Sequence, residues 1–436
     1  MKKWLQKQMK HRFIRALSVL VAGSAVSSII LLCITPVLTR LYTPEDFGVL
    51  SIFTSILYVL KIIVSLRYEA ALVLPKEKKA ALALLFIANA STFIVAGIVI
   101  LLLVTTPFTT WIGIGETHSF FWILGLSLLF VGIFQSMNNW ALRYEQYDVI
   151  NRAKISMNTG QGFGQLVFGF LNIGVIGLLL GEMLGRLTGM IQYVRYYKKD
   201  LQQANHTTFH QVKEILVRYK KFPLISSISN VIYSVAVNLP ALFLAAYFDV
   251  ATAGFYYLAQ KILTVPENLV GFSATQVYLS QAAKMMQEGQ DLKKHCLETV
   301  KHLFIIAFVI IASIDILAPI GFTFFFGHGW DTTVTFIQIL SLMYFTKMVL
   351  QPINGVFQVC EAFYMQITAE SIRLVFIILA LFFASTHKMT HFEALWMISI
   401  MTTLGYIVCA IFAWQVMNKA GDKRDNVINN SEQREI

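Results

Sequence analysis

Charged side chains are scarce in this sequence of 436 residues. Asp, Glu, Lys and Arg together make up 14% of the chain, whereas 56% of the residues are hydrophobic. Soluble domains carry about 25% charged residues, so this composition excludes an ordinary soluble protein and indicates an integral membrane protein. A membrane-crossing helix needs roughly 20 apolar residues, which leaves room for about a dozen of them.

Cysteine is also rare, and its spacing forms no motif. The four cysteines, Cys33, Cys296, Cys360 and Cys409, are scattered along the chain. Neither a zinc site nor a disulfide framework has such a spacing. We interpret them as small apolar residues, and we predict no metal site.

Apolar runs separated by turn residues predict twelve membrane spans. They are expected near 14–41, 46–74, 80–105, 118–142, 149–172, 174–196, 223–248, 252–281, 302–326, 332–358, 363–385 and 392–417. If the N-terminus is cytoplasmic, most of the 35 Lys and Arg residues lie at inner span ends, and the outer ends carry only Arg40 and Lys388. This asymmetry follows the positive-inside rule. The net charge of +11 is therefore attributed to topology rather than to nucleic-acid binding, and both termini are predicted to be cytoplasmic.

Two halves are predicted on either side of a polar linker. The expected parts are a six-helix bundle at 1–199, a cytoplasmic linker at 200–222, a second six-helix bundle at 223–418 and a polar cytoplasmic tail at 419–436. Gly48 and Gly254 each follow an outer turn with an acidic residue and begin the next helix, which suggests a parallel repeat. The segment 282–302 alternates apolar and charged residues and is expected at the inner membrane surface. The predicted fold is all-α, with two pseudo-symmetric six-helix bundles.

Ionisable residues inside the predicted spans are candidates for function, because burying them in a bilayer costs several kcal/mol unless they pair or face a cavity. The first half contains Lys61, Arg67, Glu69, Glu182 and Arg186, and the second contains Lys261, Glu267, Asp315, Lys347, Glu370 and Arg373.

Arg67 and Glu69 stand near the inner end of their span, before Pro75. Two residues apart on a regular helix, they are about 200° apart in rotation, so they are predicted not to pair with each other. Arg67 either extends toward the inner interface or faces a cavity, and Glu69 needs a partner of its own.

Glu182 and Arg186 are four residues apart with the acid first, the favourable order for a helical ion pair. They lie beside a stripe of glycines that recur every four residues and let another helix approach closely, Gly177, Gly181, Gly185 and Gly189. We interpret them as a structural pair at a helix interface.

Lys261 lies in a span interrupted by Pro266, which permits a kink. Glu267 is six residues away and is not expected to pair with it, so a cavity role is favoured for Lys261 and for the equally deep Lys61. For Arg373 a cavity role and pairing with Glu370 both stay open. Several buried cations in both halves suit a large anionic substrate, such as a phosphate.

Two stretches resemble a known family. "LYTPEDFGVLSIFTSI" (41–56) with "LRYEAALVLPK" (66–76) is similar to the N-terminal signature of polysaccharide flippases of the O-antigen (Wzx) type. "AGFYYLAQKILTVPENLVGFSATQVYLSQAAK" (253–284) resembles the start of that family's second half. The family belongs to the multidrug/oligosaccharidyl-lipid/polysaccharide exporter superfamily. The resemblance to the lipid II flippase branch is weaker, because that branch usually has two further helices.

The resemblance implies two bundles around a central cationic cavity in the bacterial plasma membrane. It implies a transporter rather than an enzyme, with no catalytic residue and no cofactor, coupled to protons or sodium ions. The substrate would be an undecaprenyl-diphosphate-linked oligosaccharide, flipped from the inner to the outer leaflet for O-antigen, capsule or exopolysaccharide assembly. A polysaccharide polymerase and a chain-length regulator would be its partners. Lys61, Arg67, Lys261 and Arg373 would bind the diphosphate or sugar, and Glu69 or Glu267 would serve coupling or gating.

Two alternatives are less well supported. A membrane-embedded polysaccharide polymerase needs a sizeable outer loop with catalytic groups, and the longest outer loop here, "TTPFTTWIGIGETH" (105–118), has no such cluster. A multidrug exporter would share the fold. Its substrates are organic cations, however, and an excess of buried Lys and Arg residues would repel them.

Overall fold

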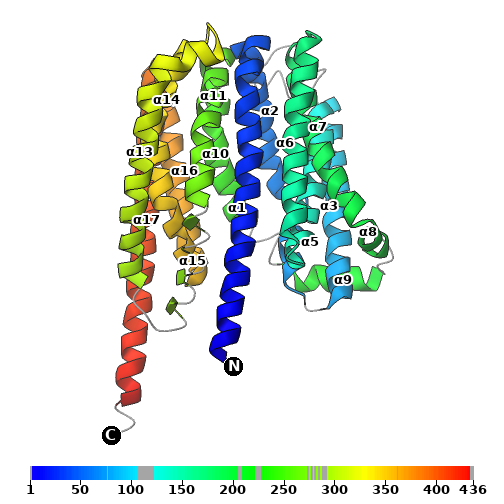
Figure 1. Cartoon of the computed structure of the whole chain (residues 1–436), viewed down its shortest axis with the longest axis vertical. Coiled ribbons are helices and arrows are strands. Elements are labelled where there is room, and N and C mark those ends of the chain that lie inside the picture. Colours follow the sequence, from blue (N-terminus) through cyan, green and yellow to red (C-terminus); the bar gives the residue numbers. More distant parts are fainter. Residues whose placement is uncertain are drawn as a thin grey trace. The chain divides into compact units, whose positions relative to one another are not determined.

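The computed structural model describes residues 2–432 apart from 76, 106–121, 205–208, 221–226, 361 and several positions between 273 and 291. The longest predicted outer loop, 105–118, lies almost entirely outside the described residues, as do parts of the linker and of the segment 282–302. Every regular element in the described part is helical (Figure 1).

The helices in chain order are α1 (Lys2–Leu41), α2 (Pro44–Ile63), η1 (Tyr68–Val73), α3 (Lys78–Thr105), α5 (Trp122–Arg143), α6 (Tyr147–Phe170), α7 (Val175–Tyr196), α8 (Lys198–Ala204), α9 (Phe209–Arg218), α10 (Ser227–Tyr247), α11 (Val250–Pro266), η4 (Glu267–Phe272), α13 (Leu292–Phe326), α14 (Asp331–Leu350), η5 (Gln351–Asn354), α15 (Gly355–Val359), α16 (Phe363–Thr386) and α17 (His391–Glu432).

Each of the twelve predicted spans corresponds to a helix. Within the described residues, ten helices are long and apolar enough to cross a membrane. The two that fall short are α11, which has 17 residues before it changes to η4, and α6, which carries polar side chains along its length. The chain is a multi-pass integral membrane protein.

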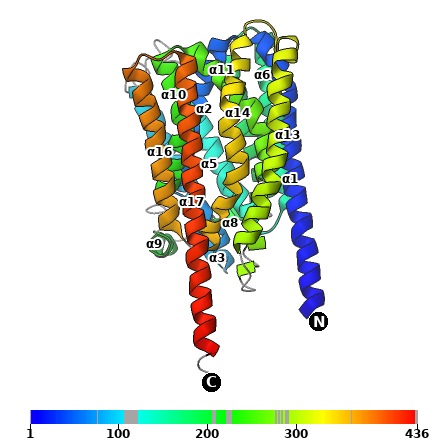
Figure 2. The same ribbon diagram turned by 90° about the vertical axis from the view of Figure 1, so that its left-hand side faces the viewer.

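Three segments differ from the sequence-based expectation or add to it. From Leu292 onward the segment 282–302 is continuous with α13, and its place at the inner membrane surface stays a prediction. The linker forms the short helices α8 and α9, and α9 lies crosswise to α3 (Figures 1 and 2). Helix α17 continues to Glu432, so the predicted tail begins as an extension of that helix.

Contacts divide the chain into two compact units. The first unit consists of Met1–Leu258 and Phe325–Trp330, and the second of Ala259–Phe324 and Asp331–Ile436. The division predicted from the sequence, with a linker at 200–222, stays a prediction.

The start of α2 is fixed by its own sequence. The main-chain nitrogen of Thr43 donates to Asp46 Oδ2 at 3.0 Å, and the nitrogen of Asp46 donates to Thr43 Oγ1 at 3.3 Å. This capping box, together with Pro44 in the first turn, satisfies main-chain groups that the helix cannot pair internally. It sets the position of Gly48 one turn later.

In the first unit, α2 and α11 touch at the two glycines that the sequence predicted to be equivalent. A Cβ atom on Gly48 would lie 1.8 Å from the carbonyl oxygen of Val250, and one on Gly254 would lie 1.9 Å from the carbonyl oxygen of Pro44. Each glycine thus faces the carbonyl four residues before the other, and the contact is reciprocal. Only glycine permits backbones to approach this closely.

Trp330 anchors the segment Phe325–Trp330 in the first unit. Its buried indole Nε1 donates to the carbonyl oxygen of Thr39 at 3.0 Å. Its ring meets Phe47 edge-on with 5.0 Å between centroids. Phe47 precedes Gly48, so this aromatic contact supports the helix turn that carries the reciprocal crossing.

Candidate functional site

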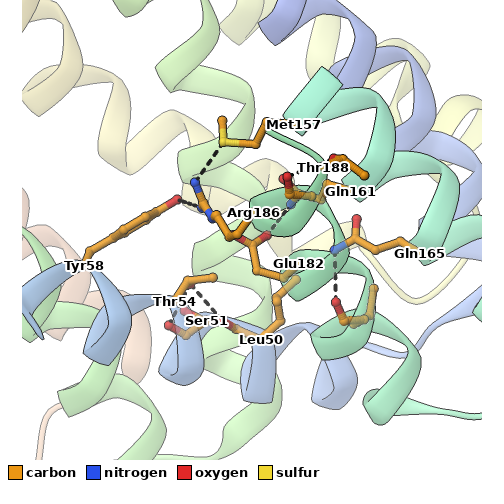
Figure 3. Close-up of polar contacts among 12 residues, drawn as sticks. Leu50, Ser51, Thr54, Tyr58, Met157, Gln161, Gln165, Glu182, Arg186 and Thr188 are labelled. Carbon is orange, nitrogen blue, oxygen red and sulfur yellow. Dashed lines mark hydrogen bonds and ion pairs between the residues drawn. The ribbon is translucent and has the colours of Figure 1, made fainter. Parts of the chain in front are cut away.

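A buried polar cluster joins α2, α6 and α7 in the first unit (Figure 3). We call it the α7 cluster, and it consists of Tyr58, Lys61, Met157, Gln161, Glu182 and Arg186. Glu182 accepts from Arg186 Nη2 and from Gln161 Nε2. The predicted ion pair between Glu182 and Arg186 is therefore present. The glycine stripe of α7 lies against α6, as its spacing predicted, with Gly181 facing Gln165.

Arg186 also contacts two other helices. Its Nη2 donates to the hydroxyl of Tyr58 on α2 at 3.3 Å, and its Nη1 lies 3.3 Å from Met157 Sδ on α6. Figure 3 shows the guanidinium between these two side chains. Its Nε is buried and has no hydrogen-bond partner among the described residues.

Lys61 adds a second cation to the α7 cluster. Its ammonium lies 4.5 Å from the centroid of the Tyr58 ring, and the Cζ of Arg186 lies 5.8 Å from the same ring. Such cation–π contacts replace only part of the lost hydration. Lys61 interacts electrostatically with Arg186 and Glu182, but it forms no ion pair with a carboxylate in the described part of the chain. Two cations and one carboxylate leave the cluster with a net positive charge.

The prediction that Arg67 and Glu69 do not pair is wrong. The α-helical conformation ends at Ile63, and Leu66 and Arg67 have φ values of 49° and 61°. The chain then enters the short 3-10 helix η1. This break turns the two side chains toward each other, with 3.4 Å between Arg67 Nη1 and Glu69 Oε1. The argument from helical rotation fails because the helix ends between Ile63 and Arg67.

Glu69 is completely buried, whereas the Arg67 side chain is 19% exposed. The carboxylate accepts from Ser65 Oγ at 2.5 Å and from Gln135 Nε2 on α5 at 2.9 Å. Tyr68 and Leu72 of η1 pack into the hydrophobic core of the first unit beside Trp140. Packing on both sides of Glu69 therefore holds its carboxylate against α5 and leaves Arg67 closer to the surface.

Replacing Gln135 by leucine is expected to destabilise the protein by about 1–3 kcal/mol, because it removes a donor from a buried carboxylate. Chemical unfolding in detergent micelles measures the change. Gln146→Leu is the matched control, since Gln146 is exposed at the start of α6 and surface changes stay within about 0.5 kcal/mol. Equal effects of the two substitutions would contradict the role of Gln135.

Glu267 occupies a comparable position in the second unit. The α-helical part of α11 ends at Pro266, and Glu267 begins the π-helix η4. Lys347 of α14 donates to Glu267 Oε2 at 2.9 Å. Tyr344 lies about one turn before Lys347 on α14, and its hydroxyl oxygen is 3.2 Å from Oγ1 of Thr264. As predicted, the ion-pair partner of Glu267 is a residue other than Lys261. Lys261 itself is partly buried on α11.

Arg373 lies deep in the second unit. It is 1% exposed, and its Nη2 is 2.7 Å from Glu370 Oε2, one turn earlier on α16. Its Cζ lies 5.0 Å from the centroid of the Tyr406 ring. Of the two readings left open by the sequence, pairing with Glu370 is therefore observed. A role for Arg373 in substrate binding stays a prediction.

The two halves share an arrangement that sequence reasoning missed. In each, the helix that carries the reciprocal glycine in its first turns ends (α2) or changes to a π-helix (α11) close to a buried carboxylate. In each, a side chain of the fourth helix holds that carboxylate: Gln135 of α5 binds Glu69, and Lys347 of α14 binds Glu267. A lysine inside a span was a signal for Lys347, but nothing in the sequence singled out Gln135 or Tyr58. Among the described residues, no group of three or more metal-binding side chains comes together.

Comparison with known proteins identifies the family. The model for the family described as "Polysaccharide biosynthesis protein" matches residues 37–335. Teichuronic acid biosynthesis protein TuaB of Bacillus subtilis (strain 168) is 20% identical over 234 residues, which are 53% of this chain and 47% of TuaB. The alignment thus spans about half the length of that relative.

Solved structures show the fold. An inward-facing multidrug resistance transporter of the MATE family, in the MOP superfamily, is 13% identical with a TM-score of 0.76, covering 91% of this chain and 96% of its own. Lipid II flippase MurJ in an inward closed conformation is 13% identical with a TM-score of 0.70, covering 96% and 93%. The predicted all-helical fold is confirmed. The chain has the fold of MOP-superfamily transporters, and it belongs to the polysaccharide biosynthesis protein family.

Proposed function

We propose that this protein flips an undecaprenyl-diphosphate-linked oligosaccharide from the inner to the outer leaflet of the bacterial plasma membrane by alternating access. The oligosaccharide would then enter O-antigen, capsule or exopolysaccharide assembly, with a polymerase and a chain-length regulator as later partners. Both termini lie in the cytoplasm in this proposal, in agreement with the distribution of Lys and Arg.

The net positive charge of the α7 cluster is the observation that carries the proposal. Among the described residues, the partly buried Lys61 forms no ion pair of its own, and the buried Nε of Arg186 has no hydrogen-bond partner. A cation buried in a membrane protein is costly unless an anion meets it. A diphosphate supplies two anionic groups that lysine and arginine bind through charge-assisted hydrogen bonds.

The other predicted residues take complementary roles. Arg67 is partly exposed beside Glu69 and would meet the head group near the inner end of α2. Lys261 and Arg373 would supply cations from the second unit. Glu69 or Glu267 would carry the coupling proton, since Glu69 follows the break after α2 and Glu267 begins a π-helix, and at such places a small shift alters the hydrogen bonds of a carboxylate.

A strain that lacks the protein tests the activity. Undecaprenyl-diphosphate-linked oligosaccharide is quantified by mass spectrometry, and its access from outside is tested with an impermeant sugar-oxidising reagent. We expect complete repeat units to accumulate and to be protected from the reagent. Repeat units that are exposed outside yet unpolymerised would point to a polymerase and overturn the proposal.

Substituting the binding residues tests the site. Lys61→Ala, Arg67→Ala and Lys261→Ala are each expected to lower surface polysaccharide roughly ten- to hundredfold at unchanged protein level. The reason is that a hydrogen bond to a charged group is worth about 1.5–3 kcal/mol, and about 1.4 kcal/mol is a factor of ten. Lys213→Ala, on the exposed side of α9, is the control. Normal polysaccharide output from all three variants would refute the binding assignment.

A multidrug exporter is the second candidate, because the MATE transporter has the same fold. The two functions are separated by growth of the deletion strain in the presence of cationic dyes and antibiotics. Increased sensitivity with normal polysaccharide would favour the exporter.

A further inference from the structure

Helix α13 of the second unit is strongly apolar and carries one carboxylate, Asp315, in the middle of the predicted span 302–326. Asp315 is eleven residues before the end of the helix at Phe326, which is about 16 Å at 1.5 Å per residue. That distance is about half of a hydrocarbon layer of roughly 30 Å. The neighbouring side chains of Ile316 and Leu317 are 65% and 63% exposed, in keeping with a helix that faces an apolar medium.

Among the described residues, one side chain forms a hydrogen bond with Asp315, and it comes from α14, which lies beside α13 in both views (Figures 1 and 2). Ser341 Oγ is 2.6 Å from Asp315 Oδ1 and 2.9 Å from the carbonyl oxygen of Ile337. A hydroxyl has a single hydrogen, and a carbonyl oxygen can only accept. When Ser341 donates to Ile337, it can bond to Asp315 only by accepting, and a carboxyl group donates only when it is protonated.

A proline in α13 leaves the main-chain carbonyl oxygen of Asp315 without its helical hydrogen bond. Pro319 lies inside the helix and has no amide hydrogen, so the main-chain carbonyl of Asp315, four residues earlier, lacks its usual helical donor. An ionised Asp315 would therefore place a charge beside an oxygen that already lacks a partner. A protonated Asp315 avoids that repulsion.

No cation neutralises this carboxylate among the described residues, and no charged side chain interacts with it electrostatically. Along the chain the nearest titratable residues are His302 and His328, each thirteen positions away. On α14 the titratable groups are otherwise engaged: Asp331 accepts from Thr323 at 2.9 Å, and Tyr344 bonds to Thr264.

Two printed ion pairs account for four other charges near the middle of the second unit's helices. Lys347 is paired with Glu267 across η4 and α14, and Glu370 is paired with Arg373 within α16. The Ser341 hydroxyl is thus the group that Asp315 depends on.

We propose that Asp315 is a proton-binding site that carries its proton at neutral pH and donates it to Ser341. The protonated state contains a chain of hydrogen bonds from Asp315 to Ser341 to Ile337. Loss of the proton turns the Ser341 hydrogen toward the carboxylate, breaks the bond to Ile337 and leaves a charge in the apolar part of α13. Proton binding at Asp315 therefore controls the contact between α13 and α14. This inference does not depend on the proposed flipping activity.

Labelling with a hydrophobic carbodiimide in lipid nanodiscs tests the protonation. A protonated carboxyl group adds its O–H across one C=N bond of the reagent, and acyl migration gives a stable N-acylurea whose added mass is that of the whole reagent. We expect peptide mapping to find the label on Asp315 at pH 7. Labelling should fall about tenfold for each pH unit once the carboxyl ionises. Absence of label on Asp315 at every pH would overturn the proposal.

Infrared spectroscopy gives a second readout that does not need the reagent. The wild-type protein should show the C=O stretch of a protonated carboxyl group at pH 7, and Asp315→Asn should lack it. Ser341→Ala should shift this band, because the carboxyl loses its acceptor. Identical spectra for the wild type and Asp315→Asn would overturn the proposal, and an unshifted band in Ser341→Ala would overturn the contact with Ser341.

Hydrogen–deuterium exchange tests the coupling to the helix contact. Exchange of the amides around Asp315, corrected for the intrinsic effect of pH, should increase at the pH where labelling is lost. The increase should be absent in Asp315→Asn, which keeps a donor toward Ser341 but cannot ionise. An identical pH profile in both proteins would contradict a control of the α13–α14 contact by the proton.

Discussion

Replacing Glu182 by alanine is expected to destabilise the protein by about 3–5 kcal/mol, the usual cost of removing one partner from a buried ion pair. Glu182 is the carboxylate of the α7 cluster, and its loss leaves Arg186 and Lys61 buried together with no anion. Chemical unfolding in detergent micelles or nanodiscs measures the free energy. The phosphate-binding proposal adds that diphosphate-containing lipid should recover part of this stability, because it replaces the missing anion.

Two further variants separate charge from packing. Glu214→Ala removes an exposed glutamate on α9 and should change the stability by less than about 0.5 kcal/mol. The double substitution Glu182→Leu with Arg186→Leu removes both charges and should cost less than Glu182→Ala alone, since no buried arginine is left unpaired. A loss of less than about 1 kcal/mol in Glu182→Ala would show that water reaches the cluster and compensates the cations.

The second large effect is expected at the reciprocal glycines. Without any movement of the helices, the methyl group of Gly48→Ala would lie 1.8 Å from a main-chain carbonyl oxygen, and that of Gly254→Ala would lie 1.9 Å from one. The two helices must then move apart, and overpacking of this kind typically costs about 1–3 kcal/mol. Valine at either position should cost more than alanine, because it adds two further methyl groups to the same contact. Thermal unfolding of the single variants measures this cost.

Gly97 provides a matched control for these substitutions. It lies inside α3, and a Cβ atom there would meet nothing within 4 Å. Gly97→Ala should stabilise the helix by about 0.5–1 kcal/mol, as alanine does in helix interiors. If Gly48→Ala behaved like Gly97→Ala, the close approach of α2 and α11 would be refuted.

The reciprocal contact also explains why two glycines far apart in the sequence have the same setting. Each lies one turn into a helix, so its Cα faces the first carbonyl groups of the opposite helix. Two equivalent helices that cross at their N-terminal turns need a residue without a side chain at this position in both copies. The repeat in the sequence thus follows from the symmetry of the contact.

Much of the fold could be predicted because local rules govern it. The twelve spans, the start of α2 and the Glu182–Arg186 pair depend on composition, on capping residues and on a four-residue spacing. A bilayer requires each spanning segment to satisfy its main-chain hydrogen bonds internally, so a long apolar run has few alternatives to a helix. The continuity of residues 292–302 with α13 was not predicted, because their charged residues do not continue the apolar run that marks the span.

What only the tertiary structure decided is the partner of each buried charge. Arg67 meets Glu69 because the chain leaves the α-helical conformation at Leu66 and Arg67, and Glu267 meets Lys347 rather than a residue of its own helix. Lys61 lies against Tyr58 and shares the carboxylate of Glu182 with Arg186 rather than forming an ion pair of its own in the described part of the molecule. The sequence alone determined that these ionisable groups are buried and costly, since hydropathy is a property of the segment. The partner of each buried ionisable side chain depends on where helices end and on which helices pack together. Contacts between residues distant in the chain decide both.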